Sequence, residues 1–372
     1  MDKKKIFNWS ITVALAGFLF GFDTVVISGA NLPIKELWNT SPIFHGVFIM
    51  SMALWGTVIG SLFGSIPCDR IGRKNTLIWI GILIAYFSNY LFQGFGGDID
   101  WRYMLGVEAI PAIFYILFVL KVPNSPRWLI LLKGEDKKAE EILRQIYPES
   151  EIKRRINQIK ESTKTGSIFS GLFNFQISLA FLIAFFNQLS GINFVLYYAP
   201  EILQSAGLAA NDSLMSSVSI GFVNLIFTMF GLRLIDKFGR KYLMKIGSIG
   251  YIISLISIGF CFIYSLNSYL LLAFILIFIA SHAIGQGTVI WVFISEIFPN
   301  SVRAKGQSLG TATHWVFAAL ITALTPYVIN MLGNNPGMIF YFFGFMMILQ
   351  LVFVVRMMPE TKGIALENMK FS

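Results

Sequence analysis

Charged side chains are scarce in this chain of 372 residues: they make up 13% of it, whereas soluble domains carry about 25%. There are only two cysteines and three histidines, so neither a disulfide framework nor a cysteine–histidine metal site is expected. We also find no phosphate-binding glycine loop and no nucleophile constellation. These absences argue against an enzyme, an ATP-driven pump and a bound cofactor.

Apolar residues, in contrast, are abundant: 55% of the chain is hydrophobic and the mean hydropathy is +0.68. About 20 consecutive apolar residues suffice to cross a bilayer as a helix. The sequence therefore predicts an all-α, polytopic membrane protein with ten spans, at 8–30, 44–66, 76–95, 101–121, 174–203, 213–235, 242–264, 269–294, 306–330 and 337–357.

The net charge of +9 follows the predicted topology. With both termini cytoplasmic and alternating spans, only Lys35 and Arg102 of the 29 lysines and arginines fall on the outer side. This is the positive-inside bias of a multi-pass protein of the inner or plasma membrane. The basic excess therefore needs no nucleic-acid partner, and we expect a monomer in the lipid bilayer.

The long polar stretch 122–173 separates four predicted helices (1–121) from six (174–372). Within this linker, apolar residues recur at helical spacing on either side of Pro148. The first set is Ala139, Ile142, Leu143 and Ile146, and the second is Ile152, Ile156 and Ile159. The spacing predicts two short amphipathic helices along the cytoplasmic face.

An internal repeat relates the two parts. The string DRIGRK at Asp69 matches DKFGRK at Asp236, and VPNSPRW after the fourth span corresponds to MPETKG after the tenth. Parallel repeats of this kind mark transporters built from two halves. From Asp69 to Pro123 there are 54 positions, but from Asp236 to Pro359 there are 123, so the first half is 69 residues shorter. That deficit corresponds to one helical hairpin.

These motifs resemble those of the sugar porter family of the major facilitator superfamily. FGFDTVVISGA is similar to the family's first helix, NQLSGINFVLYYAPEIL to its helix 7, and WVFISEIFPNSVRAKG to its helix 10 and the loop that follows. DRIGRK, PNSPRWL and PETKG resemble three further family motifs, in the family order. The resemblance implies the major facilitator fold and transport of a monosaccharide, hexose or pentose, by alternating access.

The chain departs from this pattern after Asn75, where the sequence passes into GILIAYFSNYL, which resembles the family's helix 5. Nothing corresponds to the family's helices 3 and 4, so we expect about ten helices (4 + 6) instead of twelve. Two alternatives to a working transporter stay open. The chain is a degenerate sugar porter that only binds sugar, or the gene sequence lacks an internal segment.

Sugar recognition requires polar groups beside an apolar or aromatic platform. Asn187, Gln188 and Asn193 cluster in the fifth span, and the five-residue spacing from Gln188 to Asn193 predicts unwinding near Gly191. The alternative to sugar binding is that these amides only form hydrogen bonds between helices. The resemblance implies a substrate site made of Asn187, Gln188, Asn193, Tyr197, Asn224, Gly287, Trp291, His314 and Trp315. Many family members have Gln-Trp where this chain has His314 and Trp315.

Asp23 is a carboxylate deep in the first span, where a charge costs roughly 2.5–3.5 kcal/mol. The resemblance implies that Asp23 occupies the position that binds the proton in proton-coupled family members. The family's arginine partner lies on the absent helix 4, which leaves coupling to a proton open. His45 and His282 have no partner visible in the sequence, and we interpret them as structural.

Charged residues at inner helix ends suggest a cytoplasmic gate, a set of ion pairs that break when the inner side opens. In the second half the candidates are Asp236, Gly239, Arg240, Glu296 and Arg303. In the first half they are Asp69, Arg70, Gly72 and Arg73, for which the family's matching glutamate is missing. Simple topological anchoring by positive charge is the alternative.

Overall fold

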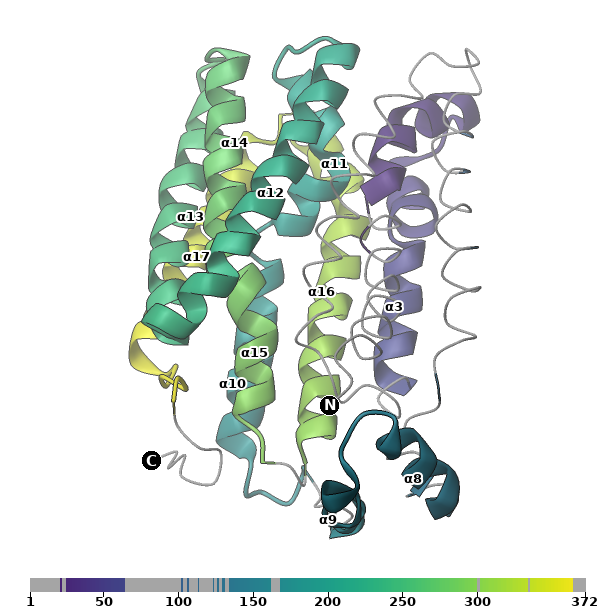
Figure 1. Ribbon diagram of the computed structural model, residues 1–372. Helices are drawn as coiled ribbons and strands as arrows, with labels where there is room; N and C mark the ends of the chain where they lie inside the picture. The colour runs from purple at the N-terminus through teal and green to yellow at the C-terminus, as the bar shows by residue number, and fades with distance from the viewer. Residues whose placement is uncertain are drawn as a thin grey trace.

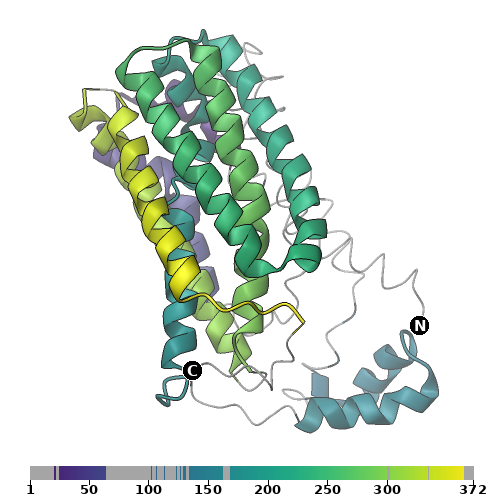
Figure 2. The same cartoon turned by 90° about the vertical axis from the view of Figure 1, so that its left-hand side faces the viewer.

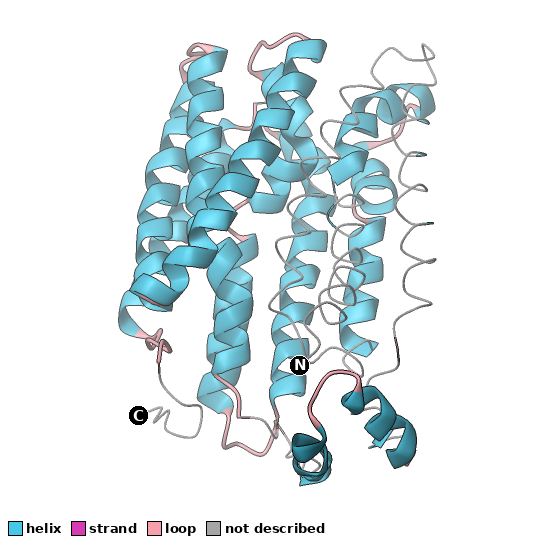
Figure 3. Cartoon of the chain, in the orientation of Figure 1, coloured by secondary structure: helices cyan, strands magenta, loops and turns pink. Residues whose placement is uncertain are grey.

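The computed structural model describes residues 25–63, 134–161, 168–299, 302–333 and 335–363, together with positions 21, 102, 106, 113, 123, 126, 129 and 130. Every regular element in these residues is helical, as Figure 3 shows. The predicted spans 8–30, 76–95 and 101–121 lie largely or wholly outside the described residues.

Six helical segments in the described part of the chain are long and apolar enough to span a membrane. They coincide with the six spans predicted after residue 173, which confirms an all-helical membrane architecture. In Figure 1 they stand side by side as one bundle. Their helices are α10 (Asn174–Gln188), α11 (Ile192–Ser205), α12 (Ala210–Phe238), α13 (Arg240–Ile263), α14 (Ser268–His282), α15 (Thr288–Glu296), α16 (Arg303–Met331) and α17 (Gly337–Arg356).

Two of these spans are interrupted. The chain leaves the helix between α10 and α11, where Gly191 has φ +81°, and a Cβ there would overlap the ring of Phe343. The predicted unwinding near Gly191 is therefore confirmed. The π-helix η4 (Ala283–Gly287) separates α14 from α15, a break that the sequence did not predict. π-turns of this kind occur frequently at functional sites.

The N-terminal part of the chain packs beside α16 (Figure 1). Residues 25–38 are helical, so the helix continues beyond residue 30, where we expected the first span to end. Our prediction of one continuous helix over 44–66 was also wrong in its first part. The chain forms α2 (Pro42–Phe44), the π-helix η1 (His45–Met50) and, after Ser51, α3 (Met52–Phe63). Gly46 lets η1 pack closely against α16, because a Cβ at this position would clash with the carbonyl oxygen of Ala323.

The linker contains the two amphipathic helices that its periodicity predicted, α8 (Asp136–Arg144) and α9 (Glu149–Glu161). Ala139 and Ile142 of α8 pack with Ile156 and Ile159 of α9, and Lys160 forms an ion pair with Asp136. Figure 2 shows this pair beyond one end of the bundle. We call that end the linker end and the opposite one the far end.

Apolar side chains lie both inside the bundle and on its surface. Phe194 meets Phe340 edge to face in the interior, with ring centroids 5.4 Å apart, and both rings are fully buried. Phe222, Ile253 and Phe345 point outward and are more than half exposed. Water disfavours such a surface, whereas lipid chains match it. The bundle is therefore built for a bilayer.

Candidate functional site

A cluster of aromatic and amide side chains joins α10, α15 and α16. The Nε2 atom of Gln188 lies 2.9 Å from Nε2 and 3.2 Å from Nδ1 of His314. The His314 ring lies 5.0 Å from the ring of Trp291 and 4.6 Å from that of Trp315, measured between centroids. Three of the predicted substrate residues, Gln188, Trp291 and Trp315, are thus each in contact with a fourth, His314.

The break after Gln188 brings further amides to this region. Asn187 and Gln188 are the last residues of α10, and Oδ1 of Asn187 accepts a hydrogen bond of 3.1 Å from Nε2 of Gln188. Asn193 begins the next helix beyond the left-handed Gly191. All three amide side chains are buried. The interruption therefore places Asn187 and Gln188 at the end of α10 and Asn193 in the first turn of α11.

Several buried polar atoms on α10, α11 and α12 have no hydrogen-bond partner. They are Oε1 of Gln188, Nδ2 of Asn193, and both side-chain atoms of Asn224 on α12. Each orphaned buried polar group costs about 1–3 kcal/mol, and such groups in a native fold require an explanation. A polyhydroxyl ligand is a suitable partner, since a hydroxyl group both donates and accepts.

Tyr197 and Gly287 complete the predicted substrate set. Tyr197 is buried on α11, one turn beyond Asn193. At Gly287 a Cβ would lie 3.1–3.2 Å from ring atoms of His282. The absent side chain thus makes room for the His282 imidazole, and the predicted place of Gly287 in the substrate site stays a prediction.

Charged residues at the linker end form an ion-pair cluster centred on Arg240. Its guanidinium donates to both carboxylate oxygens of Glu296, at 2.8 and 3.0 Å, and to Asp236 at 3.4 Å. Arg240 is 10% exposed and Glu296 is 25% exposed. Three of the predicted gate residues are therefore joined, and they tie α12, α13 and α15 together.

Two residues that the sequence analysis missed extend this cluster. The carboxylate of Glu360 accepts from the backbone N–H groups of Arg240 and Lys241 at 2.9 and 3.0 Å, and so caps the start of α13. Thr361 donates to Glu296 at 2.6 Å. Gly239, with φ +91°, allows this approach, because a Cβ would overlap the Glu360 carboxylate. The PETKG motif was the available signal.

We expected Arg303 to belong to this ion-pair cluster, but it does not. Its Nε donates to the carbonyl of Phe298 at 3.2 Å, and its Nη2 is buried without a partner. The other predicted gate residues, Asp69, Arg70, Gly72 and Arg73, lie outside the described residues, as does Asp23.

A second polar network connects the N-terminal helices to α11 toward the far end. The Glu201 carboxylate accepts from Asn31 at 2.8 Å and from Lys35 at 3.4 Å. His45 lies between Asn31 and Thr40, with Nε2 at 2.6 Å from Asn31 and Nδ1 at 2.8 Å from Thr40. The sequence analysis found no partner for His45, since these partners depend on packing.

His282 also has its partners inside the bundle. Its Nδ1 hydrogen-bonds the hydroxyl of Tyr251, which donates to Gln286 at 3.4 Å. Gln286 donates in turn to Gln350, and Gln350 to Ser248 at 2.8 Å. This chain of buried polar groups joins α13, α14, η4 and α17, in keeping with the structural role we expected for His282.

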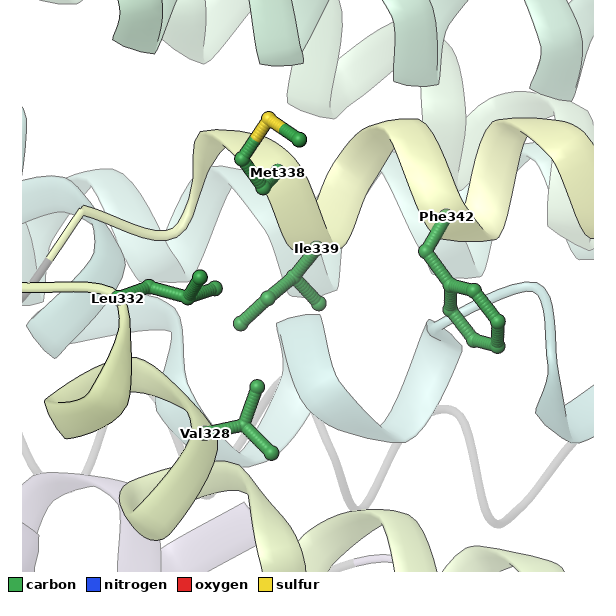
Figure 4. Close-up of a pocket in the computed structure, with 5 residues that line it drawn as sticks. All are labelled: Val328, Leu332, Met338, Ile339 and Phe342. Carbon is green, nitrogen blue, oxygen red and sulfur yellow. The ribbon is translucent and has the colours of Figure 1, made fainter.

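Figure 4 shows a surface groove that is apolar. It lies at the ends of α16 and α17 and is lined by Val328, Leu332, Met338, Ile339 and Phe342. A sugar could not replace its hydrogen bonds to water in such a groove. The polar cluster around Gln188, and not this groove, is the candidate site.

Comparison with known proteins identifies relatives of the whole chain. The D-xylose-proton symporter of Escherichia coli K12 is 33% identical over 472 aligned residues, which cover 98% of this chain and 95% of the relative. The arabinose-proton symporter of Bacillus subtilis 168 is 30% identical over 437, covering 97% and 93%. The xylose transporter XylE of E. coli, in a partially occluded inward-open conformation, superposes with a TM-score of 0.80 at 25% identity, covering 97% of this chain and 99% of XylE.

The alignments also bear on the missing segment. The alignment to the arabinose symporter has 437 positions, but this chain has only 372 residues, so at least 65 positions have no counterpart here. The profile of the family described as "Sugar (and other) transporter" matches in two pieces, residues 9–80 and 75–371, which meet where the sequence departs from the family pattern, after Asn75. Together these pieces cover nearly the entire chain, which therefore belongs to this family of sugar transporters.

Proposed function

We propose that this protein carries a monosaccharide, a hexose or a pentose, across the membrane by alternating access. The observation that carries the proposal is the set of orphaned amide atoms on Gln188, Asn193 and Asn224, buried within a membrane bundle. Sugar hydroxyls would satisfy these atoms. The indole of Trp291 would supply an apolar surface for the ring of the sugar.

The energetics favour a ligand over simple helix bridging. Amides that hold transmembrane helices together bond to each other across the interface. Here both polar atoms of Asn224 and one each of Gln188 and Asn193 lack a partner, at about 1–3 kcal/mol per atom. A ligand that removes this penalty gains affinity for the same reason. In the proposed site, Asn187, Tyr197 and Trp315 complete the lining.

Alternating access requires two states that differ by a few kcal/mol and an ion-pair set that only one of them retains. We assign this gating role to the cluster of Asp236, Arg240 and Glu296 at the linker end, which we take to be cytoplasmic. All its members belong to the half formed by residues 174–372. Its counterpart in residues 1–121 would contain Asp69 and Arg73.

Proton coupling is the finer part of the proposal. The two sugar symporters described above are proton-coupled by name. We assign proton binding to Asp23. Replacing Asp23 by asparagine should abolish uphill sugar accumulation and spare sugar exchange, because exchange needs no proton cycle. Unchanged accumulation in Asp23→Asn would remove this residue from the mechanism.

The direct test is counterflow of labelled D-xylose and D-glucose in proteoliposomes. Wild-type protein should exchange at least one sugar, and Asn224→Leu should lose exchange, since both amide atoms then disappear from the site. A matched control is Asn267→Ala, which removes an amide that caps α14 at its exposed start. Exchange by the control and loss in Asn224→Leu support the proposal, and equal exchange by both would contradict it.

A second function is favoured by the shortened N-terminal half. At least 65 aligned positions are missing relative to the arabinose symporter, and a cavity wall is absent if they form a hairpin. Such a protein would bind sugar without moving it. Sugar-dependent quenching of tryptophan fluorescence in the absence of counterflow would identify a binder. Resequencing of the gene around codons 75–81 tests whether the segment is encoded after all.

A further inference from the structure

Thr228 on α12 has a buried hydroxyl group that no described part of the chain satisfies. The residue is 1% exposed, and its Oγ1 has no hydrogen-bond partner. Many other buried hydroxyls of this bundle donate to the carbonyl four residues earlier in their own helix, as Ser217 of α12 does at 2.9 Å and Thr325 of α16 at 2.7 Å. Thr228 does not use the corresponding carbonyl of Asn224, so its hydroxyl is available to another partner.

The side-chain amide of Asn224 lies one helical turn from this hydroxyl. Residues four apart on an α-helix share a face and are separated by about 6 Å along the axis. Both polar atoms of the Asn224 amide also lack a partner, so three orphaned polar atoms lie on one face of α12. Thr228 is the nearer of the two residues to the linker end, where Asp236 belongs to the ion-pair cluster. This polar face therefore extends from Asn224 toward the proposed gate.

The same face of α12 packs against the interrupted span that carries Trp291. Asn224, Thr228 and Gly231 are all buried. A Cβ on Gly231 would lie 2.4 Å from Oγ1 of Thr288 and 3.0 Å from the carbonyl oxygen of the first residue of η4. Thr288 begins α15, and Trp291 follows three residues later. The face that holds the orphaned atoms is thus the inward face of α12, on the side of η4 and α15.

A ligand with hydroxyl groups would explain why this position carries a hydroxyl. Without a partner, a buried hydroxyl destabilises the fold, and valine, which has the same shape, would avoid the penalty. A hydroxyl of a ligand both donates and accepts, as do the hydroxyl of Thr228 and the amide of Asn224 taken as a whole. One pyranose ring carries hydroxyl groups on adjacent carbons, so it can reach both residues.

We propose that Thr228 is a further sugar-contact residue, whose hydroxyl binds one sugar hydroxyl while the Asn224 amide binds a neighbouring one. This proposal rests on the sugar transport proposed above, and it extends the site toward the linker end. Such a pair selects a sugar that has hydroxyl groups at both positions. A deoxy sugar that lacks the one facing Thr228 loses affinity.

The test measures binding of D-glucose, D-xylose and their monodeoxy derivatives to the purified full-length protein in lipid nanodiscs, by tryptophan quenching. Thr228→Val should bind the parent sugar about tenfold more weakly, or about 1.4 kcal/mol, because one sugar hydroxyl then stays buried without a partner. One deoxy derivative should also bind wild type about tenfold more weakly than its parent, but should bind Thr228→Val at least as well as the parent does. Thr228→Ser, which retains the hydroxyl, should restore most of the affinity.

The melting temperature without sugar separates a sugar contact from a structural role. Because Thr228→Val removes only an unpartnered group, this variant should melt at or above the wild-type temperature. A hydroxyl that braced two helices would instead lower the melting temperature when it is removed. Thr325→Val is the matched control: it deletes a buried hydroxyl that is bonded within its own helix, and it should bind sugar as wild type does.

Three results would overturn this inference alone. The first is wild-type sugar affinity in Thr228→Val, which would mean that the hydroxyl meets only water. The second is a lower melting temperature or loss of the folded protein in this variant, which would mean that the hydroxyl serves the fold. The third is the absence of any deoxy derivative whose loss of affinity disappears in Thr228→Val. If neither parent sugar binds to wild type, the proposed function falls as well.

Discussion

The ion-pair cluster at the linker end allows a quantitative prediction for Glu296→Gln. The carboxylate of Glu296 accepts two hydrogen bonds from Arg240, at 2.8 and 3.0 Å, and one from Thr361 at 2.6 Å. A glutamine retains one acceptor oxygen and turns an NH2 group toward a guanidinium or a hydroxyl. The variant therefore loses the charge and at least one of the two bonds to Arg240.

The magnitude follows from the burial of the pair. Hydrogen bonds to charged groups contribute about 1.5–3 kcal/mol each. Arg240, at 10% exposure, would keep the largely exposed Asp236 as its carboxylate partner, beside the carbonyl of Ile235 at 3.2 Å. Removing one partner of a fully buried pair costs about 3–5 kcal/mol. Since Glu296 is 25% exposed, we expect the lower end, about 3 kcal/mol. At about 2–4 °C per kcal/mol, the melting temperature should fall by roughly 6–12 °C.

Thermal unfolding of the detergent-solubilised protein, followed by size exclusion, measures this shift. Lys153→Met, an exposed substitution on α9, serves as the control. The pair Arg240→Met with Glu296→Leu should be less destabilising than the sum of its single changes, because no unpaired charge remains. If Glu296→Gln melts no lower than Lys153→Met, the cluster does not stabilise the bundle and the reasoning fails.

Two further predictions concern the interrupted helices and the far end. Gly191→Ala should destabilise the protein by more than the ~1–2 kcal/mol of a left-handed backbone, since its Cβ also overlaps Phe343; a melting temperature equal to wild type would refute this. Glu201→Gln should weaken the contacts to Asn31 and Lys35 and so increase thiol labelling of a cysteine introduced at the buried Ser28, on the same helix. The Ser28→Cys protein that retains Glu201 is the reference, and equal labelling rates would show that Glu201 does not hold the far end closed.

Much of the architecture could be predicted from local sequence. Each span after residue 173 is an apolar run of membrane length, so its existence depends on its own residues and on the bilayer, and all six were found. The helices α8 and α9 were predicted for the same reason, from apolar spacing around Pro148. The break at Gly191 was also foreseeable, because two amides five residues apart do not share a helix face.

The tertiary structure decided which polar groups meet. His314 reaches Gln188 across 126 positions, and Glu360 caps a helix that begins 120 positions earlier. No local pattern encodes such distances, since they depend on which helix faces pack together. By itself the sequence determined a membrane bundle with a repeat, a shortened first half and a supply of amides and aromatic rings. Only packing determined that Gln188 of α10 meets His314 of α16, because this contact depends on which faces of the two helices are opposed.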